Sequence, residues 1–254
     1  VQAREHFCSA CHCWYLMSPN VFCRNEHFVL PKVWEGPRLL WCVLHLLFPI
    51  FTWYWINGIG SRCLSAMGFE AAPFSLARAR FLWGLDVLYS VRWAAGGLIM
   101  CCKQTYPVSL LMSIVHLVGH CLLPTALALL GVSQELTWVD AAAALLAVEA
   151  AVLQQGSELQ RWQFKRNPAN RGKLHTTGLF GIARFINHTG HILGEISAGL
   201  TCRANSYYAL IAVVAFVLIA EITPETELHL KRKYKSHYES YVKQTRDLFL
   251  PGII

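Results

Sequence analysis

Charged residues are scarce in this chain. Asp, Glu, Lys and Arg together make up 15% of its 254 residues, whereas an ordinary soluble domain carries roughly 25%. Hydrophobic residues make up 55%. A soluble fold of this length could not bury so much apolar surface, so a lipid bilayer is the expected solvent for much of the chain. The same composition excludes a disordered, collagen-like or coiled-coil chain.

The N-terminal segment lacks a signal peptide and a complete zinc motif. The sequence begins at Val1, and no charged-then-apolar leader follows it. Cys8 and Cys11 have the spacing of half a zinc site, but a second pair at a suitable spacing is missing. We therefore predict no metal site. Cysteines in the apolar stretches are expected to behave as small hydrophobic residues.

Long apolar runs are what the sequence does contain. A helix needs about 20 mainly apolar residues to cross a bilayer. Six runs approach that length, at residues 39–57, 81–102, 106–131, 136–154, 178–200 and 206–222. The predicted fold is therefore all-α, a polytopic transmembrane helical bundle of about six membrane helices.

Four charged residues lie inside these runs, namely Asp86, Arg92, Asp140 and Glu149. Each costs about +2.5 to +3.5 kcal/mol on insertion scales, so each is expected to face the bundle interior, a partner or water. Asp86 and Arg92 are six residues apart, too far for a pair on one helix face, so their partners are expected on other helices. A position near a helix end, in reach of water, is the alternative.

The net charge of +7 is concentrated in two short stretches, with five Lys and Arg in 161–173 and six in 231–246. Two apolar runs separate them and predict a helical hairpin, so both stretches should lie on one face of the membrane. Their Lys and Arg excess makes that face cytosolic. Charge placed beside apolar runs in this way indicates membrane topology or phosphate binding rather than nucleic-acid binding.

The run FKRNPANRGKLHTTGLFGIARFINHTGHILGE, residues 164–195, resembles the signature of integral-membrane reductases related to steroid 5α-reductase. It is most similar to a little-characterised branch with the pattern F-K/R-x-N-P-x-N-x-G-x-x-x-x-T-G-L-[FW]. Pro224, Glu227, Lys233-Tyr234 and the tyrosines and threonine of Tyr238-x-x-Tyr241-x-x-x-Thr245 resemble that branch's C-terminal pattern. The resemblance is good over about residues 155–254. It is faint before them, where only Arg92 aligns.

The resemblance implies that NADPH is bound from the cytosol, in a pocket in the C-terminal half formed by the last helices and their polar loops. Pyrophosphate and a 2′-phosphate need several fixed cations. The implied cations are Arg161, Lys165, Arg166, Arg171, Lys173 and Arg184, and the other implied cofactor-binding residues are Glu158, Asn167, Asn170, Asn187, Glu227, Tyr238 and Tyr241. Taken singly, these residues have structural alternatives: arginines at the membrane face, tyrosines as interface anchors, Asn187 as a helix bridge.

The sequence departs from the family at the position implied to polarise the substrate. The family pattern S-R-H-P-N-Y-x-G-E reads Ala183 to His191 here, with Arg184, Asn187 and Gly190 kept. The family's Glu is thus replaced by His191, whose N–H could still donate to a carbonyl oxygen. Glu195, four residues on and on the same helix face, is expected to orient His191 or to replace the lost Glu. Packing roles for these residues in an inactive relative are the alternative.

The function implied is NADPH-dependent reduction of a carbon–carbon double bond in a lipid-like steroid, sterol or enoyl substrate, with His191 and Glu195 as catalytic residues. No proton donor can be named from the sequence. One alternative is an S-adenosylmethionine-dependent methyltransferase of the isoprenylcysteine or phospholipid type, which Glu225 and Glu227 resemble superficially. Another is a sterol-binding membrane protein that has lost the reaction.

The expected organisation has three parts. Residues 1–38 form a polar, cysteine-containing segment, 39–154 carry four membrane helices, and 155–254 form the reductase-like domain. That domain comprises a loop at 158–177, a hairpin at 178–222 and a basic tail. The expected partners are the bilayer and a hydrophobic small molecule, and the expected location is the endoplasmic reticulum with a cytosolic tail. The sequence leaves the oligomeric state open.

Overall fold

The computed structural model describes residues 35–71, 74–99, 105–130, 135–203 and 223–249, with positions 208, 211, 213, 215, 217 and 252. The N-terminal cysteines and most of the expected sixth run lie outside the described residues. Within those ranges the chain forms helices and turns and no strand. The predicted all-α membrane bundle is confirmed.

The helices join into a few long rods. The first is kinked at Asn57 and Gly58, and comprises α2 (Gly36–Tyr54), the π-helical turn η2 (Trp55–Ile59) and α3 (Gly60–Ala66). Helix α4 (Leu76–Ile99) follows. The next comprises α5 (Tyr106–His116), η3 (Leu117–Leu122) and α6 (Leu123–Leu129). The third comprises α7 (Trp138–Ala151), η4 (Val152–Gly156) and α8 (Ser157–Arg166). Two short turns, η5 (Pro168–Asn170) and η6 (Gly178–Gly181), precede α9 (Ile186–Cys202), α11 (Thr223–Tyr234) and α12 (Ser236–Gln244).

Three stretches among the described residues are long and apolar enough to cross a membrane: Gly36–Ala66, Ser109–Leu129 and Trp138–Arg166. The last has 29 residues, which at 1.5 Å per residue gives about 43 Å. A hydrocarbon core is about 30 Å thick. The rod is therefore longer than the hydrocarbon core is thick, which leaves room for one end, with much of α8, to extend beyond the lipid.

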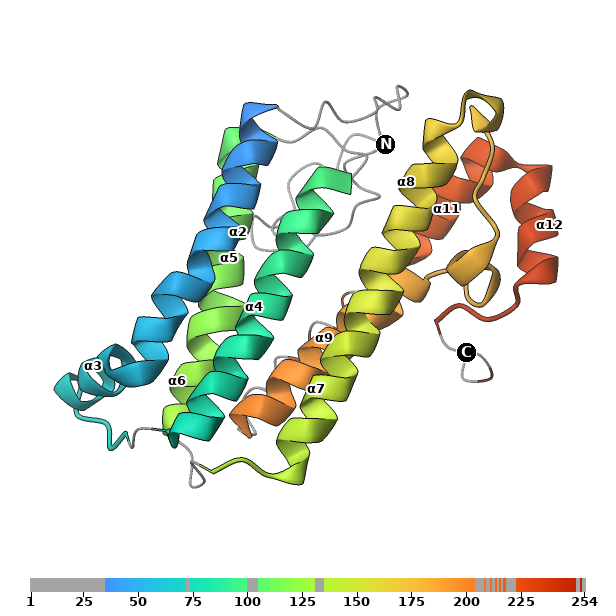
Figure 1. Ribbon diagram of the computed structural model, residues 1–254. Coiled ribbons are helices and arrows are strands. Elements are labelled where there is room, and N and C mark those ends of the chain that lie inside the picture. Colours follow the sequence, from blue (N-terminus) through green and yellow to red (C-terminus); the bar gives the residue numbers. More distant parts are fainter. Residues whose placement is uncertain are drawn as a thin grey trace, which may run out of the picture.

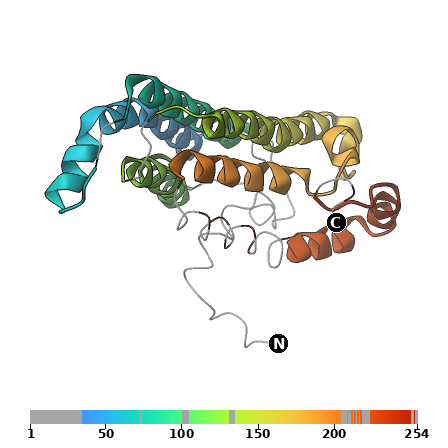
Figure 2. The same ribbon diagram turned by 90° about the horizontal axis from the view of Figure 1, so that it is seen from below.

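Helices α2, α4 and α5 pack together, and α9 packs along α7 (Figure 1). Seen from below, α11 and α12 lie beyond the start of α9, beside the end of α8 (Figure 2). We call this the basic end, defined by residues 161–173, 184–187 and 227–246. The other end of α9, with Arg78, Asp140 and Arg203, is called the opposite end.

The α7–α9 contact depends on small residues. Ala143, Ala147 and Ala150 of α7 are buried, and Ser197 of α9 donates a hydrogen bond to the Ala143 carbonyl (2.8 Å). A Cβ at Gly190 would lie 2.5 Å from the backbone nitrogen of Gln154. The backbone of α9 therefore approaches the backbone of the α7–η4–α8 rod closely at the π-helical turn η4.

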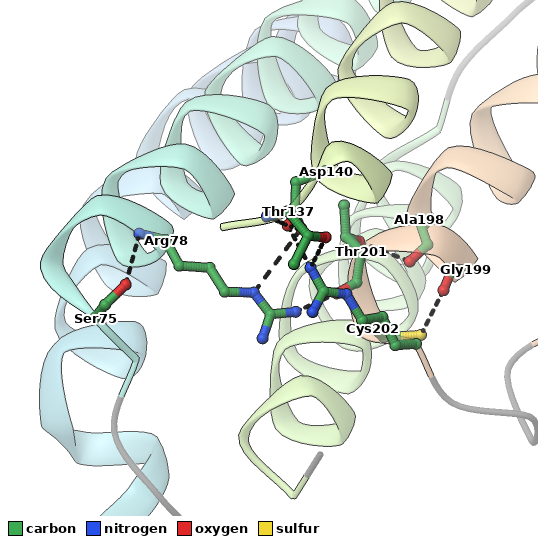
Figure 3. A network of polar contacts seen from close by, with 9 residues as sticks. Ser75, Arg78, Thr137, Asp140, Ala198, Gly199, Thr201 and Cys202 are labelled. Atoms are coloured by element: carbon green, nitrogen blue, oxygen red, sulfur yellow. Dashed lines mark hydrogen bonds and ion pairs between the residues drawn. The ribbon is translucent and has the colours of Figure 1, made fainter. Parts of the chain in front are cut away.

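Asp140 joins three helices at the opposite end (Figure 3). Its carboxylate accepts from the N-cap backbone N–H of Thr137 (2.8 Å), completing a capping box at the start of α7. Arg78 of α4 lies 3.8 Å from it and also donates to the Thr201 carbonyl at the end of α9. Arg203, just after α9, forms an ion pair with the same carboxylate. Asp140 and Arg78 are each 1% exposed.

Asp86 and Glu149, two other charged residues inside the apolar runs, have different surroundings. Asp86 accepts from the Thr52 hydroxyl of α2 at 2.5 Å, so its partner is on another helix, as predicted. Glu149 is exposed on α7 and does not face the bundle interior. The fifth apolar run was expected to be helical from Gly178, but α9 begins at Ile186. Gly178 instead has φ +63° in a short turn, a conformation that favours glycine.

Candidate functional site

The two basic stretches meet at the basic end. Lys165, near the end of α8, donates from Nζ to the hydroxyl of Tyr234 at the end of α11 (3.2 Å) and to the backbone carbonyl of Lys173. The Lys165 ammonium also lies 5.4 Å from the centre of the Tyr234 ring. Positively charged segments that are about 70 residues apart are therefore adjacent, and α8, the following loop and α11 share one surface (Figure 1).

A buried polar network lies below this surface. Glu158 on α8 forms an ion pair with Arg161, one turn further along the same helix. Its other oxygen accepts from Nδ2 of Asn187 on α9 (3.1 Å). Glu158 is 6% and Asn187 4% exposed. The structure thus brings together three of the sequence-predicted residues, with one carboxylate orienting both a guanidinium and a carboxamide.

Arg184 holds the C-terminal segment in place. Its Nη1 donates to the backbone carbonyls of Thr245 and Arg246 (2.7 Å each), and Nη2 lies 3.4 Å from Glu227. The backbone N–H of Arg184 donates to the Asp247 carbonyl (3.0 Å). Since these contacts occupy much of the guanidinium, Arg184 acts here as a link between the start of α9 and the basic tail.

The two predicted tyrosines are buried in the same region. Tyr238 donates to Glu227 (2.9 Å) and Tyr241 to the Phe180 carbonyl (2.6 Å). Burial raises the pKa of both phenols, and Glu227 raises that of Tyr238 further. Both hydroxyls therefore stay protonated and act as donors, fixing α12 against α11 and the η6 turn.

The predicted loop residues divide into those that shape the loop and those that are exposed. Asn167 accepts from the backbone N–H of Ala169 (3.0 Å), and Asn170 donates to the Phe164 carbonyl (3.0 Å). These two contacts build the turn after α8. Arg166, Arg171 and Lys173 are exposed beside it, with the Arg166 guanidinium lying over the Trp162 ring. The two asparagines thus fix the conformation of the loop backbone, and the exposed cations lie on or beside this loop.

His175 closes the inner side of this loop. Its ring stacks on Phe164 at a centroid distance of 4.7 Å. Burial lowers its pKa, and the charges of Arg161 and Lys165 lower it further. His175 is therefore favoured in its neutral form, and adds no charge to the basic end.

The two predicted catalytic residues lie deeper along α9. His191 and Glu195 are 6% and 3% exposed. Nδ1 of His191 lies 3.3 Å from the Gln154 amide nitrogen in η4, and Nε2 lies 3.7 Å from Glu195. With the amide nitrogen as donor, Nδ1 accepts and Nε2 carries the ring proton. The predicted pairing of His191 with Glu195 is thus seen as a loose contact.

The histidine that lies nearer to Glu195 than His191 was not predicted from the sequence. Nε2 of His120 in η3 lies 2.6 Å from the Glu195 carboxylate. Its neighbour His116, four residues earlier, is buried with its ring stacked on His120. Two histidines four residues apart inside an apolar run could have indicated a polar site, because a buried imidazole needs a hydrogen-bond partner. What the sequence could not supply was their carboxylate partner, 75 residues away.

Arg92 is the other charged group in this interior. It is 4% exposed, and its guanidinium lies over the ring of Tyr89. A Cβ at Gly194 would lie 2.9 Å from Nη1, so α9 has a glycine where the guanidinium passes. Nε and Nη1 make no hydrogen bond to any described residue. In the described part of the chain, no group of three or more His, Cys, Asp and Glu side chains is arranged to hold a metal ion.

The fold and this arrangement define a membrane helical-bundle protein with a basic, polar C-terminal end. A family described as proteins of unknown function (DUF1295) matches residues 76–245. That match covers about two thirds of the chain, and the chain belongs to this family.

One curated relative is the 7-dehydrocholesterol reductase of Danio rerio. It is 29% identical to this chain over 87 residues, which cover 33% of the chain and 18% of the reductase. The chain thus matches less than a fifth of the length of that relative.

Proposed function

We propose that this protein is a membrane reductase that uses NADPH to reduce a carbon–carbon double bond in a sterol-like lipid. The observation that carries the proposal is the meeting of two basic stretches at one end of the bundle, directly above the Glu158–Asn187 network. The name of the curated relative, a reductase acting on a sterol, supports the substrate class.

The residues present fit a phosphorylated dinucleotide. Arg161, Lys165, Arg166, Arg171 and Lys173 lie in α8 and the loop that follows it. Several fixed cations at the edge of the membrane suit the phosphates of NADPH better than S-adenosylmethionine, whose sulfonium is itself positive. Arg184, Glu227, Tyr238 and Tyr241 are assigned a supporting role, since their polar groups already bond one another or the backbone.

The face of α9 supports a path from this end into the bundle. Asn187, His191 and Glu195 are spaced by four residues, so they lie on one face of the helix and about 6 Å apart along it. Asn187 has both donor and acceptor atoms for a ribose hydroxyl or a carboxamide. His191 follows one turn deeper. When bound, NADPH would supply the hydride, and these residues would orient it and the acceptor.

In the proposed mechanism the acceptor enters from the bilayer and its double bond is conjugated to, or polarised by, an oxygen function. The N–H at Nε2 of His191 donates to that oxygen and stabilises the negative charge that develops there. Arg92, whose guanidinium keeps donors without hydrogen bonds to the described residues, adds positive charge to the same interior. The basic end would face the cytosol, and the endoplasmic reticulum is the proposed location.

The test is binding of NADPH to the purified protein in detergent. Quenching of the protein fluorescence by NADPH measures the affinity. Arg171→Ala removes one exposed loop cation and is expected to weaken binding about tenfold, the loss of one charge-assisted contact. The matched control is Arg80→Ala, an exposed arginine near the start of α4 at the other end of the bundle. Equal affinities in wild type and Arg171→Ala would count against the loop as the phosphate site.

A second measurement separates the reductase from the methyltransferase alternative. A ligand that binds the folded state raises the unfolding temperature, and at 100 times its Kd it adds about 2.7 kcal/mol to stability. We expect NADPH to raise the unfolding temperature and S-adenosylmethionine to leave it unchanged. The reverse result would favour methyl transfer. Turnover is then followed as NADPH oxidation with a panel of sterol and other lipid enones.

A further inference from the structure

We propose that His120 is the proton donor of the reduction, with Glu195 holding its ring in place. This inference rests on the proposed function, because it supplies the second hydrogen that a double bond needs after hydride addition. The observation behind it is the buried contact of 2.6 Å between Nε2 of His120 and the Glu195 carboxylate.

The geometry separates the roles of two histidines that share one carboxylate. Nε2 of His120 is 2.6 Å from Glu195, whereas Nε2 of His191 is 3.7 Å away. A hydrogen bond of this length to a carboxylate is strong and fixes the orientation of the ring. The side chains of His120 and Glu195 are 7% and 4% exposed, so water screens this pair little. Of the two histidines, His120 is therefore the one that Glu195 holds directly.

The second ring nitrogen of His120 is free to hold the proton that is transferred. Nδ1 is buried and makes no hydrogen bond to any described residue. The ring is held by stacking on His116, with centroids 5.3 Å apart, and by an edge contact with Trp93 at 6.0 Å. Trp93 also meets His191 edge-on at 6.4 Å. Both imidazoles thus contact one indole, and only His120 lies within hydrogen-bond distance of Glu195.

The surrounding charges suit a reaction that builds up negative charge. The titratable and charged groups that act on this pair are His45 from α2, Asp86 and Arg92 from α4, His116 from α5 and His191 from α9. With His120 charged, its ion pair with Glu195 has no net charge, and Arg92 remains as a cation beside it. An oxyanion formed on the acceptor would therefore be stabilised rather than repelled.

Hydride addition to the β-carbon moves the double-bond electrons toward the oxygen of the acceptor and gives an enolate. The enolate then reforms its carbonyl while its α-carbon bonds to the proton of Nδ1, whose N–H bond breaks. His120 is left neutral, with its Nε2–H still donating to Glu195. Water returns the proton to Nδ1 before the next turnover.

The first experiment compares His120→Gln with the matched control His45→Gln. Glutamine keeps a donor for Glu195 but cannot act as an acid, and His45 is bonded through Nδ1 to the Trp41 carbonyl of its own helix. We expect kcat to fall at least about 100-fold in His120→Gln, within the range for loss of an acid catalyst, with NADPH affinity unchanged. The solvent deuterium isotope effect should rise in this variant and the effect of deuterated NADPH should shrink. Equal kcat in the two variants would overturn the proposal.

The second experiment needs no turnover. The nitrogen NMR spectrum of protein labelled with ¹⁵N-histidine distinguishes imidazolium from neutral imidazole. We expect His120 to give an imidazolium signal in the wild type and a neutral signal in Glu195→Gln. A neutral His120 in the wild type overturns the proposal even if His120→Gln does not fold. A wild-type protein that binds no NADPH overturns the proposed function itself, whereas binding and turnover that do not depend on His120 overturn only the acid role.

Discussion

The opposite end and the basic end both combine buried carboxylates with arginine, but in different proportions. At the opposite end one carboxylate, Asp140, receives two arginines and a helix N-terminus. At the basic end the buried Glu158 is paired with Arg161 and Asn187, and three further cations of the loop are exposed. The first arrangement pairs its charges with one another inside the protein. The second leaves positive charge facing outward.

This difference gives the opposite end a structural role and is consistent with the proposed anion-binding role of the basic end. Asp140 joins α4, α7 and the end of α9, so its charge is used to fix helices. The cations of 161–173 contribute less to holding helices together, since Arg171 and Lys173 are exposed. Changes at the opposite end should therefore alter stability, and changes in the exposed loop should alter binding.

The largest effect on stability is expected from Asp140→Ala. Removing one partner of a buried ion pair leaves uncompensated charge and typically costs about 3–5 kcal/mol. The N-terminus of α7 would lose its capping carboxylate as well. The matched control is Glu149→Ala, which removes an exposed carboxylate from the same helix and should stay within about 0.5 kcal/mol of the wild type. Chemical unfolding in detergent measures both, and equal losses would remove the distinction between the two ends.

A smaller effect is expected from Tyr241→Phe at the basic end. The change removes the hydrogen bond to the Phe180 carbonyl and keeps the ring, which should lower stability by about 1 kcal/mol. Tyr54→Phe, at an exposed position of α2, is the control and should have no effect. If Tyr241→Phe instead abolished NADPH binding with stability intact, the hydroxyl would have to contact the cofactor rather than the backbone.

The smallest effect concerns pH at the basic end. Because the pKa of His175 is lowered in the folded protein, the unfolded chain takes up a proton below about pH 6.5 that the folded chain does not. His175 therefore makes stability fall as the pH falls below that value. His175→Phe should lose part of this acid sensitivity. Unfolding midpoints at neutral and mildly acidic pH test it, and an unchanged pH dependence in the variant would contradict the assignment.

The fold was largely predictable because lipid imposes a simple rule on sequence. An apolar run of about 20 residues has to be helical, and a chain that crosses twice returns to its starting face. The first fact was enough to predict the bundle. The expected hairpin put 161–173 and 231–246 on one face, and Lys165 does contact Tyr234, but most of the second run of that hairpin lies outside the described residues. The start of α9 was not predictable in this way, since residues 184 and 185 bond to the backbone of Asp247 and Leu248, which no local pattern reveals.

For the candidate site, the sequence predicted which residues take part better than it predicted which atoms they contact. The family resemblance indicated Glu158, Arg161 and Asn187, which the structure brings together. It did not indicate that Arg184 binds the carbonyls of Thr245 and Arg246, because backbone acceptors leave no trace in a sequence pattern. His120 was missed for a related reason: its significance depends on Glu195, and only the packing of η3 beside α9 relates the two.

The absence of a side chain at Gly190 has a consequence for the whole molecule. A methyl group there would meet main-chain atoms of Gln154 and Ala150, which no change of rotamer can move aside. The α7 and α9 rods would have to separate, and Asn187 and His191 would shift together because both belong to α9. A displacement of α9 would therefore alter the polar network at the basic end and the buried histidine contacts at the same time.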